Sequence, residues 1–182
     1  MKKKRISLVM ALVLVLTCVI GGTLAYLTAK TNSVTNTFTV GNIDITLAET
    51  TTDYKMVPGN TIAKDPTVTV NAGSEACWLF VKIEESTNPK LDDYISYSIA
   101  TGWTKLESGV YYREVDANTA NAGTSFYVLK DNQVTVKTTV TKAMMDALKV
   151  EGATQPTLTF TAYAVQKDNI ATAAAAWAEA SK

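Results

Sequence analysis

Residues 77–84 read CWLFVKIE, an apolar run that ends in charged residues, and they predict a strand of the protein core. A second stretch, 157–165 or TLTFTAYAV, alternates threonine with apolar and aromatic residues. Threonine fills 28 of the 182 positions, many of them beside Val, Ile, Phe or Tyr. This alternation is typical of strands that are buried on one face. Both stretches therefore predict a β-rich fold.

The same pattern continues outward from these two stretches. It predicts further strands at 67–70, 94–99, 103–106, 110–114, 125–129 and 134–141. Ile43, Ile45 and Leu47 share one parity, whereas Phe38 and Val40 have the other, so a bulge or turn is expected at residues 41–42. Turns are also expected at 58–60 and, as a hairpin connection, at 107–109. Many short strands with regular turns predict an all-β fold, an antiparallel jelly-roll-like β-sandwich.

Two short helices interrupt the strands. Thr141 is a suitable N-cap for a helix through Leu148, and Asp168 for one over residues 169–180. The second helix is expected to cover one end of the sandwich with an apolar face made of Ile170, Ala174 and Trp177.

The N-terminus has the three parts of a secretory signal peptide, which predicts a secreted or cell-surface protein. A basic cluster at 2–5 precedes an apolar run at 6–20 and small residues at 21–25. Cleavage is expected after Ala25, with Thr23 two residues before Ala25 and Tyr26 as the first residue of the mature chain. The alternative is an uncleaved membrane anchor. The chain then divides into a signal peptide (1–25), an extended segment (26–37) and a β-sandwich domain (38–182).

The composition excludes several kinds of chemistry. The chain has no histidine, which rules out histidine-based catalytic groups and His-ligated zinc. Its 17 basic and 17 acidic residues give no basic excess for binding nucleic acid. Cys77 is alone once the signal peptide leaves, and it is expected to be a small buried hydrophobe. Residues 84–85 and 92–93 are acidic pairs, whose neighbouring side chains point apart on a strand. We therefore expect no catalytic residues, no cofactor and no metal.

Three stretches resemble the TasA/camelysin family. They are GGTLAYLTA at 21–29, NTFTVGNIDI at 36–45, and TAYAVQ at 161–166 with the Ala-rich helix that follows. The resemblance implies a signal peptide cut by a SipW-type signal peptidase of Gram-positive bacteria. It also implies a jelly-roll domain and assembly into biofilm-matrix fibres by strand donation. Some relatives carry a metallo-endopeptidase label, which a chain without histidine does not fit.

The expected function is therefore that of a secreted structural protein that assembles head to tail with copies of itself. The candidate donor strand is 26–37, whose apolar side chains are Tyr26, Leu27, Ala29 and Val34. Other matrix proteins or a polysaccharide are further expected partners. The alternative is a monomeric secreted or surface binding module, and a metallo-endopeptidase is the third class.

Overall fold

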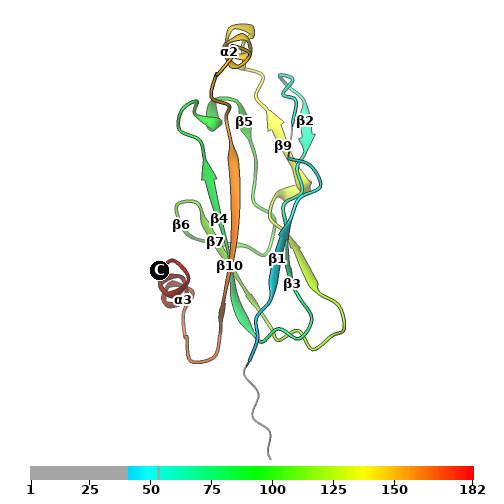
Figure 1. Cartoon of the computed structure of the whole chain (residues 1–182), viewed down its shortest axis with the longest axis vertical. Coiled ribbons are helices and arrows are strands. Elements are labelled where there is room, and N and C mark those ends of the chain that lie inside the picture. The colour runs from blue at the N-terminus through cyan, green and yellow to red at the C-terminus, as the bar shows by residue number, and fades with distance from the viewer. Residues whose placement is uncertain (1–40, 53) are drawn as a thin grey trace, which may run out of the picture. The chain divides into compact units, whose positions relative to one another are not determined.

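The computed structural model describes residues 41–52 and 54–182, and these form a sandwich of antiparallel strands (Figure 1). One layer is a four-stranded sheet with the strand order β10-β4-β7-β6. Its strands are β4 (Cys77–Glu85), β6 (Thr104–Glu107), β7 (Val110–Val115) and β10 (Leu158–Gln166). β10 and β4 pair over nine residues without a shift in register, from Leu158 opposite Glu85 to Gln166 opposite Cys77.

The other layer consists of two three-stranded sheets that continue into each other. Their orders are β1-β3-β8 and β2-β9-β5. The strands are β1 (Ile45–Ala48), β2 (Thr61–Ala63), β3 (Thr67–Val70), β5 (Ile95–Ser96), β8 (Thr124–Tyr127) and β9 (Gln133–Val136). Lys64 N donates to Asn132 O (2.8 Å) and Val128 N to Pro66 O (3.0 Å), which join the sheets. The 3-10 turn η2 (Lys130–Asn132) bends the chain between β8 and β9, and a second such turn, η1 (Leu91–Asp93), precedes β5.

The main core lies between the two layers. Val68 and Val70 of β3 meet Leu79 and Val81 of β4, and all four are fully buried. The alternate residues of β4, Trp78 and Phe80, point to the opposite face of their sheet, where they are buried as well. A strand covered on both faces has no polar side, which explains why residues 77–81 form an unbroken apolar run.

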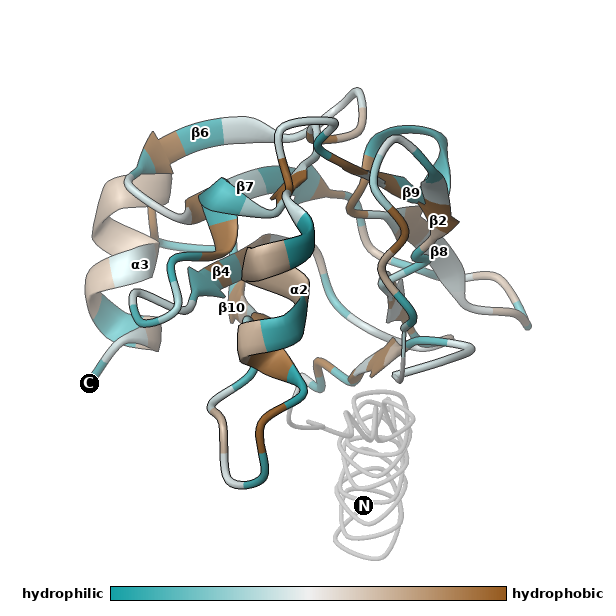
Figure 2. Ribbon diagram, turned by 90° about the horizontal axis from the view of Figure 1, so that it is seen from above, coloured by the Kyte–Doolittle hydropathy of each residue, from teal (hydrophilic) through white to brown (hydrophobic). Residues whose placement is uncertain are grey.

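The helix α3 (Ala173–Ala180) covers that second face of the sheet. Figure 2 shows α3 beside β4, on the side of the sheet away from β9, β2 and β8. The ring centroids of Phe80 and Trp177 are 5.3 Å apart, and Trp78 Nε1 donates to Ile170 O (3.0 Å). The prediction that this helix covers an end of the sandwich is therefore wrong, because it covers a face.

The start of α3 also differs from the prediction. Thr172 is the N-cap, with its side-chain oxygen accepting from Ala175 N (3.2 Å), whereas Asp168 lies in the preceding turn. Asn169 adopts a left-handed φ of 65°, which ends any helix at this point. Ala173 and Ala176 are the buried alanines, and the predicted Ala174 is exposed. The other helix, α2 (Lys142–Leu148), is confirmed with Thr141 as its cap, since its oxygen accepts from Met144 N (3.3 Å).

Several strands are shorter than predicted. β9 stops at Val136, not at residue 141, because Lys137 N donates to Tyr94 O and Val140 N closes a turn onto Lys137 O. β5 keeps only two residues of the predicted 94–99, and β8 ends at Tyr127. The strand β2 is absent from the prediction. The fold class itself is confirmed as an all-β antiparallel sandwich with two short helices, while the signal-peptide helix lies outside the described residues.

The predicted hairpin at 107–109 joins β6 to β7, and it needs a glycine. Gly109 has a φ of 73°, and a Cβ there would lie 2.6 Å from Ile83 O. We expect Gly109→Ala to lower the free energy of unfolding by about 3 kcal/mol, from left-handed strain plus the clash. Gly73→Ala is the matched control, because Gly73 has a φ of 78° but no atom within 4 Å of the added Cβ. Urea unfolding of both variants tests this, and equal losses would contradict it.

Candidate functional site

The edge strand β10 has the properties of a surface that accepts another strand. β4 is its only paired neighbour in the described residues, so its other edge carries main-chain groups without a strand partner there. The strand reads LTFTAYAVQ, with no charge and no proline, and it has no bulge. Natural sheets protect their edge strands with charged side chains, prolines or bulges. The nine residues of β10 carry none of these.

The inward side chains of this edge are small. Ala162 and Ala164 pair with Val81 and Leu79, whose side chains belong to the main core, so they face between the layers, as does Phe160. Each of the three is only partly buried. An alanine at the edge of a core leaves room for a side chain from an added strand.

The opposite layer leaves apolar surface exposed at the same corner. β1 lies beside β10, next to the half of its edge that ends at Gln166 (Figure 1). Leu47 of β1 pairs with buried Val68 and so shares its inward face, yet 37% of Leu47 is exposed. We call Ile45 and Leu47 of β1, with Phe160, Ala162 and Ala164 of β10, the β1–β10 seam. In the described residues β1 is paired with β3 alone, so its outer edge also has no strand partner there.

The other edge of the same sheet is protected. β6 carries Lys105 and Glu107 in four residues, and its pairing with β7 is irregular between them. The corner beside β6 is closed by an aromatic stack on Arg113, whose guanidinium carbon lies 3.7 Å from the Phe126 ring centroid. Trp103 lies on the same guanidinium and donates from Nε1 to Tyr127 O (2.8 Å). The two edges of the sheet therefore differ in their readiness to accept a strand.

A cavity of about 460 Å³ opens at the other end of the seam, where β10 begins. Leu158 and Thr159 line it together with Lys64. The Lys64 ammonium is almost buried and pairs with Glu49 (2.7 Å), and Tyr54 also donates to Glu49 (2.9 Å). Burial and this carboxylate raise the pKa of Tyr54 far above its usual value. The cluster holds the segment after β1 beside the edge of β2 that has no strand partner within residues 41–52 and 54–182, and the sequence did not predict this arrangement.

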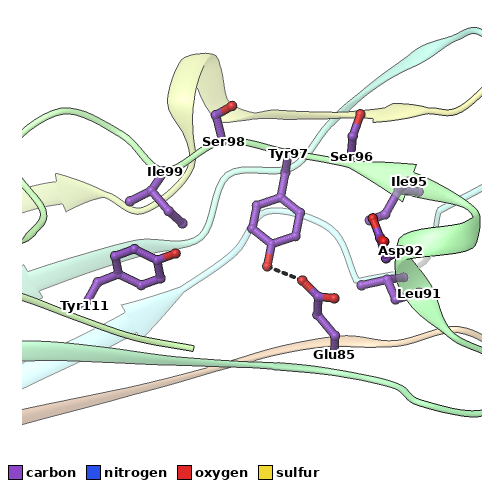
Figure 3. A pocket seen from close by; sticks show the side chains of 9 residues that line it. All are labelled: Glu85, Leu91, Asp92, Ile95, Ser96, Tyr97, Ser98, Ile99 and Tyr111. Atoms are coloured by element: carbon purple, nitrogen blue, oxygen red, sulfur yellow. Dashed lines mark hydrogen bonds between the residues drawn. The ribbon is translucent and has the colours of Figure 1, made fainter. Parts of the chain in front are cut away.

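A second, open cavity of about 440 Å³ lies beside β5 (Figure 3). Tyr97 points across it and donates to Glu85 Oε1 (2.6 Å). Burial, and after it the bond to Glu85, raises the pKa of Tyr97 well above its usual value. Hydrogen bonding to Lys137 lowers the pKa of Asp92, so this carboxyl is ionised at neutral pH. The cavity thus offers a neutral phenol and carboxylates but no nucleophile paired with a base.

The acidic pairs do not form catalytic pairs. Glu84 bonds to Lys82 (2.8 Å), whereas Glu85 accepts from Tyr97, as expected for neighbours on a strand. Asp92 pairs with Lys137 (2.8 Å).

A zinc centre does not fit the residues present. Zinc sites in proteins are built mainly from cysteine and histidine. The sequence has no histidine, and Cys77 is fully buried in β4. In the described part, no group of three or more His, Cys, Asp or Glu residues could hold a metal ion.

The predicted burial of Cys77 is confirmed, and it has a chemical consequence. Burial raises the pKa of the Cys77 thiol to about 11. In the chain 26–182, where Cys77 is the one cysteine, we expect no reaction of Cys77 with a thiol reagent at pH 8 in the folded state and full reaction in urea. Because the folded-state pKa lies above the unfolded value, the fold loses stability as pH rises from about 9 toward 11. Rapid labelling of the native protein would contradict this.

The predicted cleavage and donor residues all lie outside the described residues: Thr23, Ala25, Tyr26, Leu27, Ala29 and Val34. The α-helices of residues 41–52 and 54–182, α2 and α3, are too short to cross a membrane.

Comparison with known proteins decides the family. Residues 1–90 match the family described as camelysin metallo-endopeptidase. The chain belongs to the TasA/camelysin family. No curated protein and no solved structure matches it. The family's description names a metallo-endopeptidase, and this camelysin-family chain lacks the histidines that a zinc peptidase uses.

Proposed function

We propose that this camelysin-family protein is a secreted structural subunit that assembles head to tail into extracellular matrix fibres. The observation that carries the proposal is the β10 edge, nine residues long, uncharged and without a bulge, beside the exposed Leu47. Strand addition at such an edge supplies main-chain hydrogen bonds, and alternate side chains supply specificity. The protected β6 edge explains why one edge of the sheet, and not both, takes part.

The donor is residues 26–37 of a second copy. A SipW-type signal peptidase cuts after Ala25, and the new N-terminus at Tyr26 frees the segment from the apolar run before it. The side chains of Leu27 and Ala29, two residues apart and so on one face of a strand, supply apolar surface for the β1–β10 seam. Because donor and acceptor surfaces differ, the contact is heterologous and continues into a filament. The domain that accepts the strand is residues 38–182.

In this proposal the protein is not an enzyme and needs no cofactor. The residues present do not build a zinc site, and the cavity at Tyr97 lacks a nucleophile paired with a base. Fibre growth should therefore be the same with and without a chelator, and casein should remain uncut.

A monomeric binding module is the second candidate. The open cavity beside β5 favours it, because Ser96, Ser98 and Asp92 offer hydroxyl and carboxylate groups suited to a polar ligand such as a matrix polysaccharide.

Electron microscopy of the purified mature chain, 26–182, separates the two candidates. The proposal expects filaments, and it expects N-terminal sequencing of secreted material to begin at Tyr26. Persistent monomers at high protein concentration, with retention on a polysaccharide column, would favour the binding module instead.

A further inference from the structure

The two ends of the sandwich differ in what they present. The exit pole is the end where residues 41–44 join the fold: Glu75 N donates to Asn42 O (2.9 Å) and Asn71 N to Asp44 O (2.9 Å). β10 ends at the same pole, where Lys167 N donates to Ala76 O (2.9 Å). The α2 pole is the opposite end, with α2 and the start of β10 (Figure 1). Gln155 Nε2 donates to Leu148 O there (2.7 Å).

The length of the donor segment places two neighbouring subunits close together. At about 3.3 Å per residue, nine donor residues cover the roughly 30 Å of β10. Three residues of 26–37, with 38–40, then remain as a connection of at most about 20 Å. The exit pole of the donating subunit must therefore lie within about 20 Å of one pole of the accepting subunit.

The direction of pairing identifies that pole. A donor that enters at the α2 pole runs antiparallel to β10, whereas one that enters at the exit pole runs parallel to it. All strand pairs of the described fold are antiparallel, and antiparallel pairing is slightly more stable per residue. Contact between two exit poles would also place the same surface on both sides, which closes a dimer and gives no fibre.

The charges of the two poles agree with this choice. In the described residues, the exit pole carries four carboxylates besides Glu114, and the lysine there, Lys167, is paired with Glu114. The carboxylates are Asp44, Glu75, Asp116 and Asp168. The α2 pole carries the exposed lysines Lys55, Lys142 and Lys149 against Asp146 and Glu151, and because Lys142 and Lys149 both pair with Asp146, its excess of positive charge is small. Two exit poles would repel, whereas an exit pole and an α2 pole attract.

The α2 pole also leaves apolar side chains uncovered. Val57, in the loop before β2, is 50% exposed, and Val150, just after α2, is 64% exposed. They are two of the four large hydrophobic residues that stand out as exposed in the described residues. A flat contact with a second copy would cover both.

We infer that the exit pole of one subunit docks on the α2 pole of the next, so that acidic side chains of one copy face lysines of another. This inference rests on the proposed function. The inference adds an end-to-end interface between subunits, separate from the donated strand 26–37, and this interface sets the direction of the fibre.

Charge reversal tests the interface on the mature chain, 26–182, at low salt. The variant Lys142→Glu/Lys149→Glu makes both poles acidic, and Asp44→Lys/Glu75→Lys/Asp116→Lys makes both poles basic. Each alone should assemble at least about tenfold more slowly than the unmodified chain, because like charges meet at every contact. A 1:1 mixture should recover the rate by alternating the two variants. Lys105→Glu/Lys130→Glu, on exposed lysines away from both poles, is the matched control and should assemble normally.

The outcomes distinguish a failure of the end-to-end interface from a failure of the proposed function. Unmodified chains that form fibres, with both reversed variants equally fast or with a mixture no faster than its components, would overturn the interface and leave strand donation standing. Unmodified chains that form no fibres would overturn both. Circular dichroism of each variant establishes that a slow variant is folded.

Discussion

Ala162→Lys is expected to abolish fibre growth while leaving a folded monomer. Ala162 faces between the layers at the β10 edge, and its partner on β4 is the buried Val81. An inward lysine at an edge is a device by which natural sheets prevent strand addition, since pairing would bury its ammonium. The lysine stem can reach solvent at the open corner, so the monomer keeps its fold. Sedimentation and electron microscopy measure the loss.

Two further variants make this result interpretable. Thr104→Lys places the same residue on the exposed, protected edge strand β6, and it should not affect assembly. Leu47→Lys changes the other side of the seam at a residue that is already 37% exposed, so its fold is at little risk. If folded Ala162→Lys and Leu47→Lys both polymerise at the unmodified rate, the β1–β10 seam is not the acceptor.

Deleting residues 26–37 from the mature chain is also expected to abolish fibre growth. The described sandwich begins after this segment, with Ile43 and Ile45 already packed on the main core. The shortened chain should therefore unfold in urea at nearly the same midpoint and form no fibres. Analytical ultracentrifugation gives its state of association.

A variant that keeps the whole donor segment shows whether its apolar side chains, and not only its length, are needed for assembly. Leu27→Asp/Ala29→Asp/Val34→Asp keeps all twelve donor residues and removes three of their apolar side chains. It should be as inactive as the deletion, because charged side chains cannot enter the seam. If the shortened chain forms as many fibres as the unmodified chain, strand donation by residues 26–37 is wrong.

The sequence predicted the central sheet well because its signals are local. The apolar run 77–84 and the alternation at 157–165 each coincide with a strand to within one residue, β4 and β10. Thr141 was identified as a cap because the side chain and the amide that it bonds lie three residues apart. The start of α3 was placed wrongly because Asp168 and Thr172 are both suitable caps, and an asparagine between them is compatible with a helix as well as with the left-handed turn that Asn169 makes.

The candidate site could not be predicted in the same way. Whether β10 is an edge strand depends on which strands pair, and those partners lie far away in the sequence. The Lys64–Glu49 pair joins residues on two different segments and looks like surface charge in a linear reading. The ends of β5 and β9 were missed because the bond of Lys137 to Tyr94 sets them, a contact between distant residues.

Mixing two variants that cannot assemble is a direct test of strand donation to the β1–β10 seam. The chain without residues 26–37 keeps its seam, and Ala162→Lys keeps its donor segment, so each supplies what the other lacks. Native mass spectrometry of an equimolar mixture should show a 1:1 heterodimer that neither variant forms alone, and no longer species. A mixture that contains only the two folded monomers would contradict strand donation to the β1–β10 seam.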